Sequence, residues 1–207
     1  AAPASLWREQ PAIAEAIRGA EDARNVPARV ARGDLGRWRP PSFAKQSSPN
    51  RLVEIAQWER DTLFPKHQLA TQLGLLQSYG SVKLMDYESL MFIAQQYGRE
   101  QPSGQRIPAP TILRLLGAEY LVLPDASQPK FATRIEPPVD QASCWPEDTA
   151  LWRMNRPLPR TWIAHEVEVL PPLPFPLRIA AVDKRTRDVV FPDGKPRDFR
   201  RQAVVET

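Results

Sequence analysis

Proline is the residue that most restricts what this chain can fold into. It supplies 23 of the 207 residues, roughly double the share of about 5% that is usual in proteins. Because proline fixes its own φ angle and has no backbone N–H, it interrupts helix interiors and central strands. The sequence therefore argues against one large regular sheet or bundle.

The remaining composition is that of a folded protein. Apolar residues make up 42% and charged residues 25% of the chain, so disorder throughout is not expected. The net charge is +4, and the basic residues are scattered, whereas nucleic-acid binders gather them on one face. No nucleic-acid partner is therefore expected. We find neither a secretory leader nor an apolar run of the roughly 18 residues that span a membrane, and we expect the chain to be a piece of a longer protein.

Apolar residues at helical spacing occur mainly in the first half of the chain. The pattern predicts helices over residues 1–20, from about residue 49 onwards, over 86–97 and over 111–116. Ser48 and Asp86 are the expected N-caps of two of them. Glu88 would then lie in a first turn, where the helix dipole favours a carboxylate.

Strand patterns occur mainly in the second half. The continuous apolar run Tyr120–Leu123 follows a helix and predicts an inner strand covered on both faces. Further strands are predicted at residues 27–31, 149–154 and 160–169, with a hairpin of 178–182 and 188–191. Together these patterns predict an α/β layered domain with a mixed sheet. We treat residues 1–207 as a single domain, with a proline-rich irregular segment at 124–148 and the start of a second β-rich unit at 170–207.

The chain lacks the local signatures of common cofactor and nucleophile sites. It contains no G-x-G-x-x-G, phosphate-binding loop, G-x-S-x-G, H-E-x-x-H or C-x-x-C motif. A zinc site needs three or four ligands, and the chain has only two His and one Cys. No cofactor is expected. We also predict that no two of His67, Cys144 and His165 lie within hydrogen-bond reach.

A few residues are candidates for chemistry, and each also has a structural interpretation. The carboxylates of Asp86 and Glu88 could serve acid–base or metal chemistry, but a helix cap and first turn explain them better, so no metal is expected there. His165 precedes Glu166, but strand alternation would point the two to opposite faces, which favours a structural His. The six Trp, several beside Arg, could stack on sugars, although core packing is favoured.

The segment Asn155–Arg160 contains two prolines, which cannot donate to a sheet ladder. We therefore predict an extended bend between two strands. Arg160 is expected to fix this bend through a carboxylate or through backbone carbonyls.

Three stretches in fixed order resemble the extracytoplasmic part of YfhO-type bacterial membrane proteins, large polytopic proteins related to the GT-C class of glycosyltransferases. They are Leu76–Val82 running into Asp86–Leu90 and Tyr97, then Leu115–Val122, then Trp152–Trp162. The N-terminal stretches Ile13–Arg18 and Pro27–Val30 also resemble the family pattern. The chain departs from the family pattern at Asp86, where the family tends to have Gly, and at Gly117-Ala118, where it tends to have Asn-Val.

The resemblance implies a location and a partner. GT-C enzymes use a polyprenyl-phosphate sugar donor, and their catalytic carboxylate lies in a loop outside this stretch, so no catalytic residue carries over. The chain would be a non-catalytic accessory domain on the outer face of the bacterial membrane. Its partners would be the membrane-embedded remainder of the same polypeptide and a glycan or lipid-linked sugar. Candidates for a functional surface are Asp86, Tyr87, Asn155, Arg160 and His165.

Two other classes remain open from the sequence. A free-standing hydrolase would use carboxylates such as Asp86 and Glu88. A carbohydrate-binding module would use exposed Trp. Whether the parent protein is an enzyme stays open as well.

Overall fold

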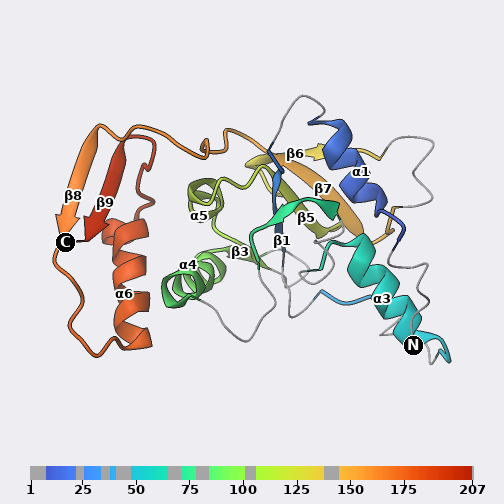
Figure 1. Cartoon of the computed structure of the whole chain (residues 1–207), viewed down its shortest axis with the longest axis horizontal. Coiled ribbons are helices and arrows are strands. Elements are labelled where there is room, and N and C mark those ends of the chain that lie inside the picture. The colour runs from blue at the N-terminus through green and yellow to red at the C-terminus, as the bar shows by residue number, and fades with distance from the viewer. Residues whose placement is uncertain are drawn as a thin grey trace. The chain divides into compact units, whose positions relative to one another are not determined.

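The structure is a computed structural model that describes residues 8–21, 26–33, 38–40, 48–64, 71–77, 84–100, 106–137 and 145–206 (Figure 1). The chain divides into two compact units, which we describe separately. The first comprises Ala1–Tyr79, Glu100–Ile107 and Ala118–Asn155, and the second comprises Gly80–Arg99, Pro108–Gly117 and Arg156–Thr207. Within the described residues, no helix is both long and apolar enough to cross a bilayer.

The first unit is built on a five-stranded sheet in the order β2-β1-β5-β7-β6. Its elements are α1 (Ala12–Gly19), β1 (Arg29–Arg32), α3 (Arg51–Asp61), β2 (Gly74–Leu75), β4 (Arg106–Ile107), β5 (Tyr120–Pro124), β6 (Ala132–Ile135) and β7 (Thr149–Met154). Strand β1 pairs in parallel with β2 and β5, while β7 pairs antiparallel with β5 and β6. The sheet is therefore mixed, as the sequence predicted.

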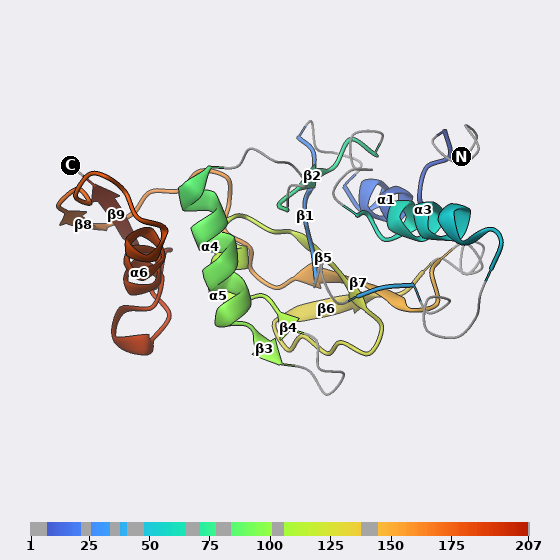
Figure 2. The same cartoon turned by 90° about the horizontal axis from the view of Figure 1, so that it is seen from below.

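Strand β5 is the central strand of this sheet, and all five of its residues are buried. This confirms the prediction made from the Tyr120–Leu123 run. Val122 lies opposite Leu151 on β7, and both belong to a core that includes Ile13 and Ile17 of α1. Figure 2 shows α1 and α3 on the same side of the sheet. The layers thus form because α1 buries its apolar face on one face of the strands.

The hydroxyl group of Tyr120 lies at the edge of this core. Its ring is fully buried, and its hydroxyl donates to Glu21 Oε1 at 2.7 Å. Burial, together with the hydrogen bond to Glu21, raises the pKa of Tyr120 well above its ordinary value. The tyrosine therefore remains a neutral donor that ties Glu21, two residues past the end of α1, to β5.

The second unit contains three helices and a small two-stranded sheet. Its elements are α4 (Met85–Gln96), α5 (Pro110–Leu115), β8 (Glu166–Leu170), α6 (Ile179–Val190), a 3-10 turn (Pro192–Gly194) and β9 (Gln202–Glu206). The two-residue strand β3 (Arg99–Glu100) lies where the two units meet in the sequence. Strands β8 and β9 pair in parallel. The core of this unit is formed by Ile93, Ala94, Ala109, Ile112, Leu158, Val190, Phe191 and Phe199.

Polar contacts fix the helices and strands of the second unit. Ser89 on α4 donates to Asp183 on α6 at 2.5 Å. Arg197 forms an ion pair with Glu168 of β8 at 2.7 Å and donates to the carbonyl of Val189 on α6 at 2.6 Å. Because the Arg197 side chain is only 7% exposed, these contacts are stronger than those of a solvated pair. Arg197 therefore ties the edge strand to the helix.

The predicted hairpin of residues 178–191 is wrong, since this stretch forms helix α6. Its β-branched residues suggested strands, but Val182 and Val190 are eight residues apart and both are buried in the helix. Burial of one helical face has outweighed the local β preference. The predicted strand over 160–169 begins only at Glu166, so His165 lies just before the strand rather than within it.

Two predicted N-caps are also wrong. Helix α4 has Leu84 at its N-cap, and Asp86 and Glu88 both lie in its first turn without capping it. Helix α3 has Asn50 at its N-cap. Ser48 instead accepts the N–H of Asn50 at 3.1 Å and donates to Glu54 at 2.7 Å. The strand predicted at 149–154 is confirmed as β7.

Candidate ligand-binding cleft

The first unit contains a fully buried arginine at the end of β1. Arg32 is 0% exposed, and its Nε donates to the carbonyl of Thr62 at 3.0 Å. Its Nη2 donates to the Thr62 hydroxyl at 3.1 Å and its Nη1 to the carbonyl of Gly33 at 3.4 Å. Thr62 is the C-cap of α3, where the helix dipole favours a cation. Arg32 therefore fixes the C-terminal end of α3 to the sheet.

The guanidinium of Arg32 lies among aromatic rings. Its central carbon is 4.2 Å from the centroid of Trp38, 5.1 Å from that of Trp58 and 5.3 Å from that of Phe64. Trp38 and Trp58 meet edge to face at 5.3 Å. Cation–π attraction is strongest where water is excluded, so these rings help to stabilise the buried charge. We call Arg32, Trp38, Trp58 and Phe64 the arginine–aromatic cluster.

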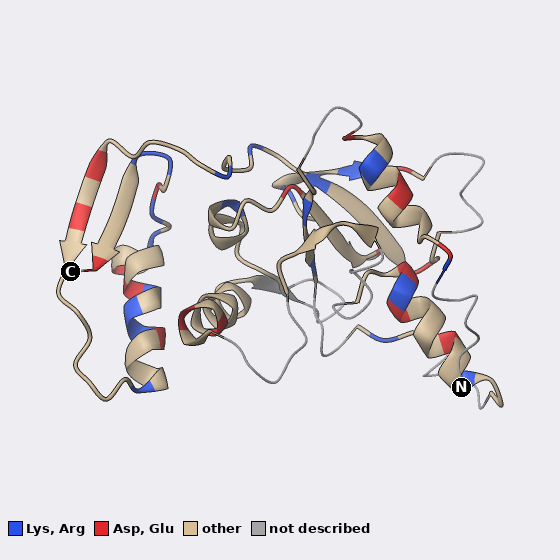
Figure 3. Cartoon of the chain, in the orientation of Figure 1, with Lys and Arg blue, Asp and Glu red and all other residues tan. Residues whose placement is uncertain are grey.

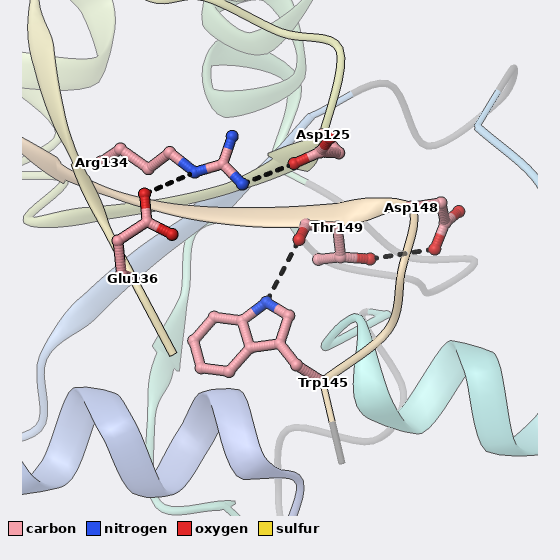
Figure 4. Close-up of polar contacts among 6 residues, drawn as sticks. All are labelled: Asp125, Arg134, Glu136, Trp145, Asp148 and Thr149. Carbon is pink, nitrogen blue, oxygen red and sulfur yellow. Dashed lines mark hydrogen bonds and ion pairs between the residues drawn. The ribbon is translucent and has the colours of Figure 1, made fainter. Parts of the chain in front are cut away.

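The carboxylate of Asp148 accepts hydrogen bonds from both indole N–H groups of this cluster. It accepts from Trp38 at 2.9 Å and from Trp58 at 3.1 Å. The hydroxyl of Thr149 donates to the same carboxylate at 3.2 Å, and the indole of Trp145 donates to the carbonyl of Thr149 at 3.1 Å (Figure 4). The beginning of β7 thereby holds three tryptophans through their only polar atoms.

An open cleft of about 790 Å³ lies beside this cluster. It is lined by residues preceding and within α1, by one face of α3, and by residues 145–147 before β7. Glu54, Gln57, Trp58 and Asp61 recur on α3 at i, i+3, i+4 and i+7 and so share that face. The indole N–H groups of Trp58 and Trp145 point to protein acceptors. Trp58 and Trp145 therefore contribute only ring surface to the cleft.

The cleft has a strong excess of negative charge among its described residues. Five carboxylates line it, against the single cation Arg60: Glu9, Glu15, Glu54, Asp61 and Glu147. Figure 3 shows acidic segments on both α1 and α3.

Arg60 is held by two of the cleft carboxylates. Its Nη1 lies 3.2 Å from Glu9 and its Nη2 lies 2.7 Å from Asp61. Burial lowers the pKa of Arg60, but hydrogen bonds and charge attraction from Asp61 and Glu9 outweigh it and leave the pKa above its ordinary value. Arg60 thus remains charged and holds Glu9 and Asp61 in place. Glu15, Gln57 and Glu147 are exposed and available to a ligand.

The cleft suits an uncharged or amino-bearing ligand that carries many hydroxyl groups. Carboxylate and amide oxygens accept from hydroxyls, and tryptophan rings pack against the apolar faces of such molecules. A phosphate group would meet Coulomb repulsion from the carboxylates. In the part of the chain that the structure describes, no three His, Cys, Asp or Glu side chains are placed to hold a metal ion.

The surface candidates suggested by sequence do not form this cleft. Asp86, Tyr87, Arg160 and His165 belong to the second unit, whereas Asn155 ends the first. Asp86 is exposed and lines a separate hollow of about 390 Å³ with Trp162 and Leu173, while Tyr87 is half-buried. His165 is exposed and its backbone N–H donates to Arg201. His67 and Cys144 lie outside the described residues, so the prediction about their distance stays untested.

Asn155 has a structural role at the end of β7. Its backbone N–H donates to Phe131 at 3.0 Å, and its side-chain oxygen accepts from Thr133 at 3.0 Å. The chain then bends at Arg156, where φ is +56°. Arg200 donates to the carbonyls of Arg156 and Pro157, which fixes the bend. The predicted role of Arg160, which is exposed, stays a prediction.

Sequence reasoning missed the cleft, although one signal was present. The stripe Glu54–Gln57–Trp58–Asp61 has helical spacing and mixes carboxylates with an aromatic ring. The prediction instead followed the apolar residues Leu52, Ile55 and Ala56. Leu52 is in fact 75% exposed.

A scan against protein-family models, a search of curated proteins and a search of solved structures each found no match to the chain. What the fold defines is an α/β protein of two compact units. The resemblance to YfhO-type proteins remains a hypothesis that rests on the three sequence stretches.

Proposed function

We propose that the chain is a non-catalytic accessory domain on the outer face of a bacterial membrane protein, and that the cleft of its first unit binds a saccharide. The resemblance supports the location. One observation carries the ligand class: a cleft of about 790 Å³ is lined by two tryptophans and five carboxylates. Its volume lies in the range of about 300–1,000 Å³ that is usual for small-ligand sites.

The negative charge of the cleft restricts which kinds of saccharide can bind there. Lipid-linked sugars carry phosphate at one end, and the carboxylates would repel that end. The cleft is therefore suited to the neutral or amino-bearing sugar portion. A lipid-linked donor would have to present its sugar to the cleft and keep its phosphate outside.

The hydrolase alternative has weaker support. An active site gathers an acid or a nucleophile, a base and oxyanion donors around one point. Among the described residues, Asp86 and Glu88 lie in the first turn of α4, while His165 is exposed and lies just before β8. Of these three residues, only Asp86 lines the hollow beside α4.

Titration of the purified chain with neutral and amino-bearing oligosaccharides tests this proposal. Gln57→Ala and Glu147→Ala each remove an exposed polar group of the cleft, and each is expected to weaken binding by about fivefold, because a lost hydrogen bond is worth about 1 kcal/mol. Glu136→Ala is the matched control. It removes an exposed carboxylate of the same unit that pairs only at the surface with Arg134, and it should leave binding unchanged.

Two results would overturn the proposal. One is the absence of saccharide binding, or binding that both cleft variants leave intact. The other is turnover of generic esterase, phosphatase or glycosidase substrates that persists through purification and disappears in Asp86→Ala or His165→Ala.

A further inference from the structure

The loop between β8 and α6 presents apolar side chains to solvent. In residues 171–179 every residue except Leu173 is exposed. Phe175 is 93% exposed, Leu177 48% and Ile179 67%. Figure 1 shows this loop as the orange segment that joins β8 to α6. Single exposed apolar residues are ordinary, but three in five consecutive residues, from the loop into the first residue of α6, mark an interaction surface.

The backbone of this loop is suited to a medium without water. Pro171, Pro172, Pro174 and Pro176 have no N–H. The N–H of Leu173 already donates to Glu206 at 2.7 Å. An unsatisfied N–H costs several kcal/mol in the hydrocarbon of a bilayer, and the four prolines and the bonded Leu173 avoid that cost at five of the nine residues 171–179. Because proline also fixes the backbone, little conformational freedom is lost on binding.

Basic side chains lie near the end of the loop that leads into α6. Residues 171–179 contain no Asp or Glu, and Arg178 follows the apolar tip and is exposed. Figure 3 shows a basic segment where the loop enters α6. Lys184, one turn and a half into α6, is also exposed. Arg185 donates to the carbonyl of Pro171 at 2.9 Å and holds the base of the loop.

Two acidic groups near the loop are held by protein donors. Asp183 on α6 accepts from Ser89 of α4, and Glu206 of β9 accepts the N–H of Leu173. Anionic lipid headgroups attract basic side chains by about 1 kcal/mol per residue near the surface. Arg178 and Lys184 therefore complement an anionic membrane.

We propose that this loop inserts Phe175, Leu177 and Ile179 into the interface of an anionic lipid bilayer, with Arg178 and Lys184 at the headgroups. Apolar side chains that sink to the headgroup–acyl boundary, with basic residues beside them, define an interfacial anchor. A protein partner is the rival occupant. The four prolines favour lipid, since a partner strand would need a continuous row of backbone donors to pair and these residues interrupt it. The inference concerns the second unit and does not depend on the saccharide cleft.

A fluorescent label at the tip tests the insertion in the full 207-residue chain. Cys144 is the only cysteine, so Cys144→Ser gives a background for Phe175→Cys carrying an environment-sensitive nitrobenzoxadiazole dye. With vesicles of phosphatidylethanolamine and phosphatidylglycerol, we expect blue-shifted and brighter emission. The matched control is Leu52→Cys with the same dye, because Leu52 is 75% exposed on the first unit. Its emission should not change.

Vesicle sedimentation gives the second readout. Phe175→Glu in the otherwise native chain should reduce the bound fraction by about tenfold or more, because burial of a phenylalanine is lost. Leu52→Glu should have no effect, and pure phosphatidylcholine vesicles should bind the native chain more weakly. The proposal is overturned if the dye at position 175 does not respond to anionic vesicles. It is also overturned if Phe175→Glu sediments like the native chain, or if the tip mediates only self-association.

Discussion

Replacement of Arg32 by alanine is expected to destabilise the first unit by about 4 kcal/mol. The substitution leaves the carbonyl and hydroxyl of Thr62 without their donor, at about 1–3 kcal/mol for each buried unsatisfied group, and opens a cavity beside the aromatic rings. Arg32→Met fills most of that volume but supplies no donor, so it should cost less, about 2 kcal/mol. Removal of a buried charge can itself be favourable. Both variants lose the charge and the hydrogen bonds, so the difference between the costs of Arg32→Ala and Arg32→Met measures the packing contribution.

Urea unfolding monitored by tryptophan fluorescence measures this effect. Trp38, Trp58, Trp145 and Trp152 belong to the first unit, so the signal reports mainly on that unit. A single cooperative transition gives the free energy of unfolding of the first unit. A cost of less than about 1 kcal/mol for Arg32→Ala would contradict the role assigned to the arginine–aromatic cluster, as would an equal cost for Ala and Met.

Loss of the Asp148 carboxylate is expected to have the next largest effect. Asp148→Ala leaves the indole N–H groups of Trp38 and Trp58 without their acceptor, and we expect a destabilisation of about 3 kcal/mol. Asp148→Asn keeps one oxygen and should cost about 1 kcal/mol. Because Trp58 and Trp145 line the cleft, Asp148→Ala should also weaken saccharide binding at temperatures where the unit remains folded.

A control for Asp148 lies close by on the same unit. Asp125 pairs with Arg134 at 2.7 Å, but both side chains are substantially exposed (Figure 4). Exposed ion pairs contribute little, so Asp125→Ala should change the free energy of unfolding by no more than about 0.5 kcal/mol. If Asp125→Ala and Asp148→Ala had equal effects, the tryptophan contacts of Asp148 would not be what stabilises this region.

The central strands could be predicted from sequence because their signal is local. The run Tyr120–Leu123 is continuous and apolar, and no other element type suits four such residues between a helix end and a proline. Residues 149–154 were likewise predicted with the correct bounds. Helix α6 was not, because its valines favour strands locally, and the burial of Val182 and Val190 that favours a helix exists only in the folded protein.

The cleft could not be predicted because its parts are far apart in the sequence. Glu15, Trp58 and Trp145 come together only when α1, α3 and the beginning of β7 pack on one sheet. Arg32 gave no sequence signal of burial either. An arginine at the end of a short strand is ordinarily solvated, and its acceptors and aromatic neighbours come from residues further along the chain.

The location of the native protein tests the account most directly. Membranes from cells that express the native gene should retain the protein through an alkaline carbonate wash. Protease added to intact spheroplasts should cleave within this chain, as detected by antibodies against residues 1–207, whereas in inside-out vesicles the chain should be protected. A protein recovered in the soluble cytoplasmic fraction, or cleaved only in inside-out vesicles, would contradict an accessory domain on the outer face of the membrane.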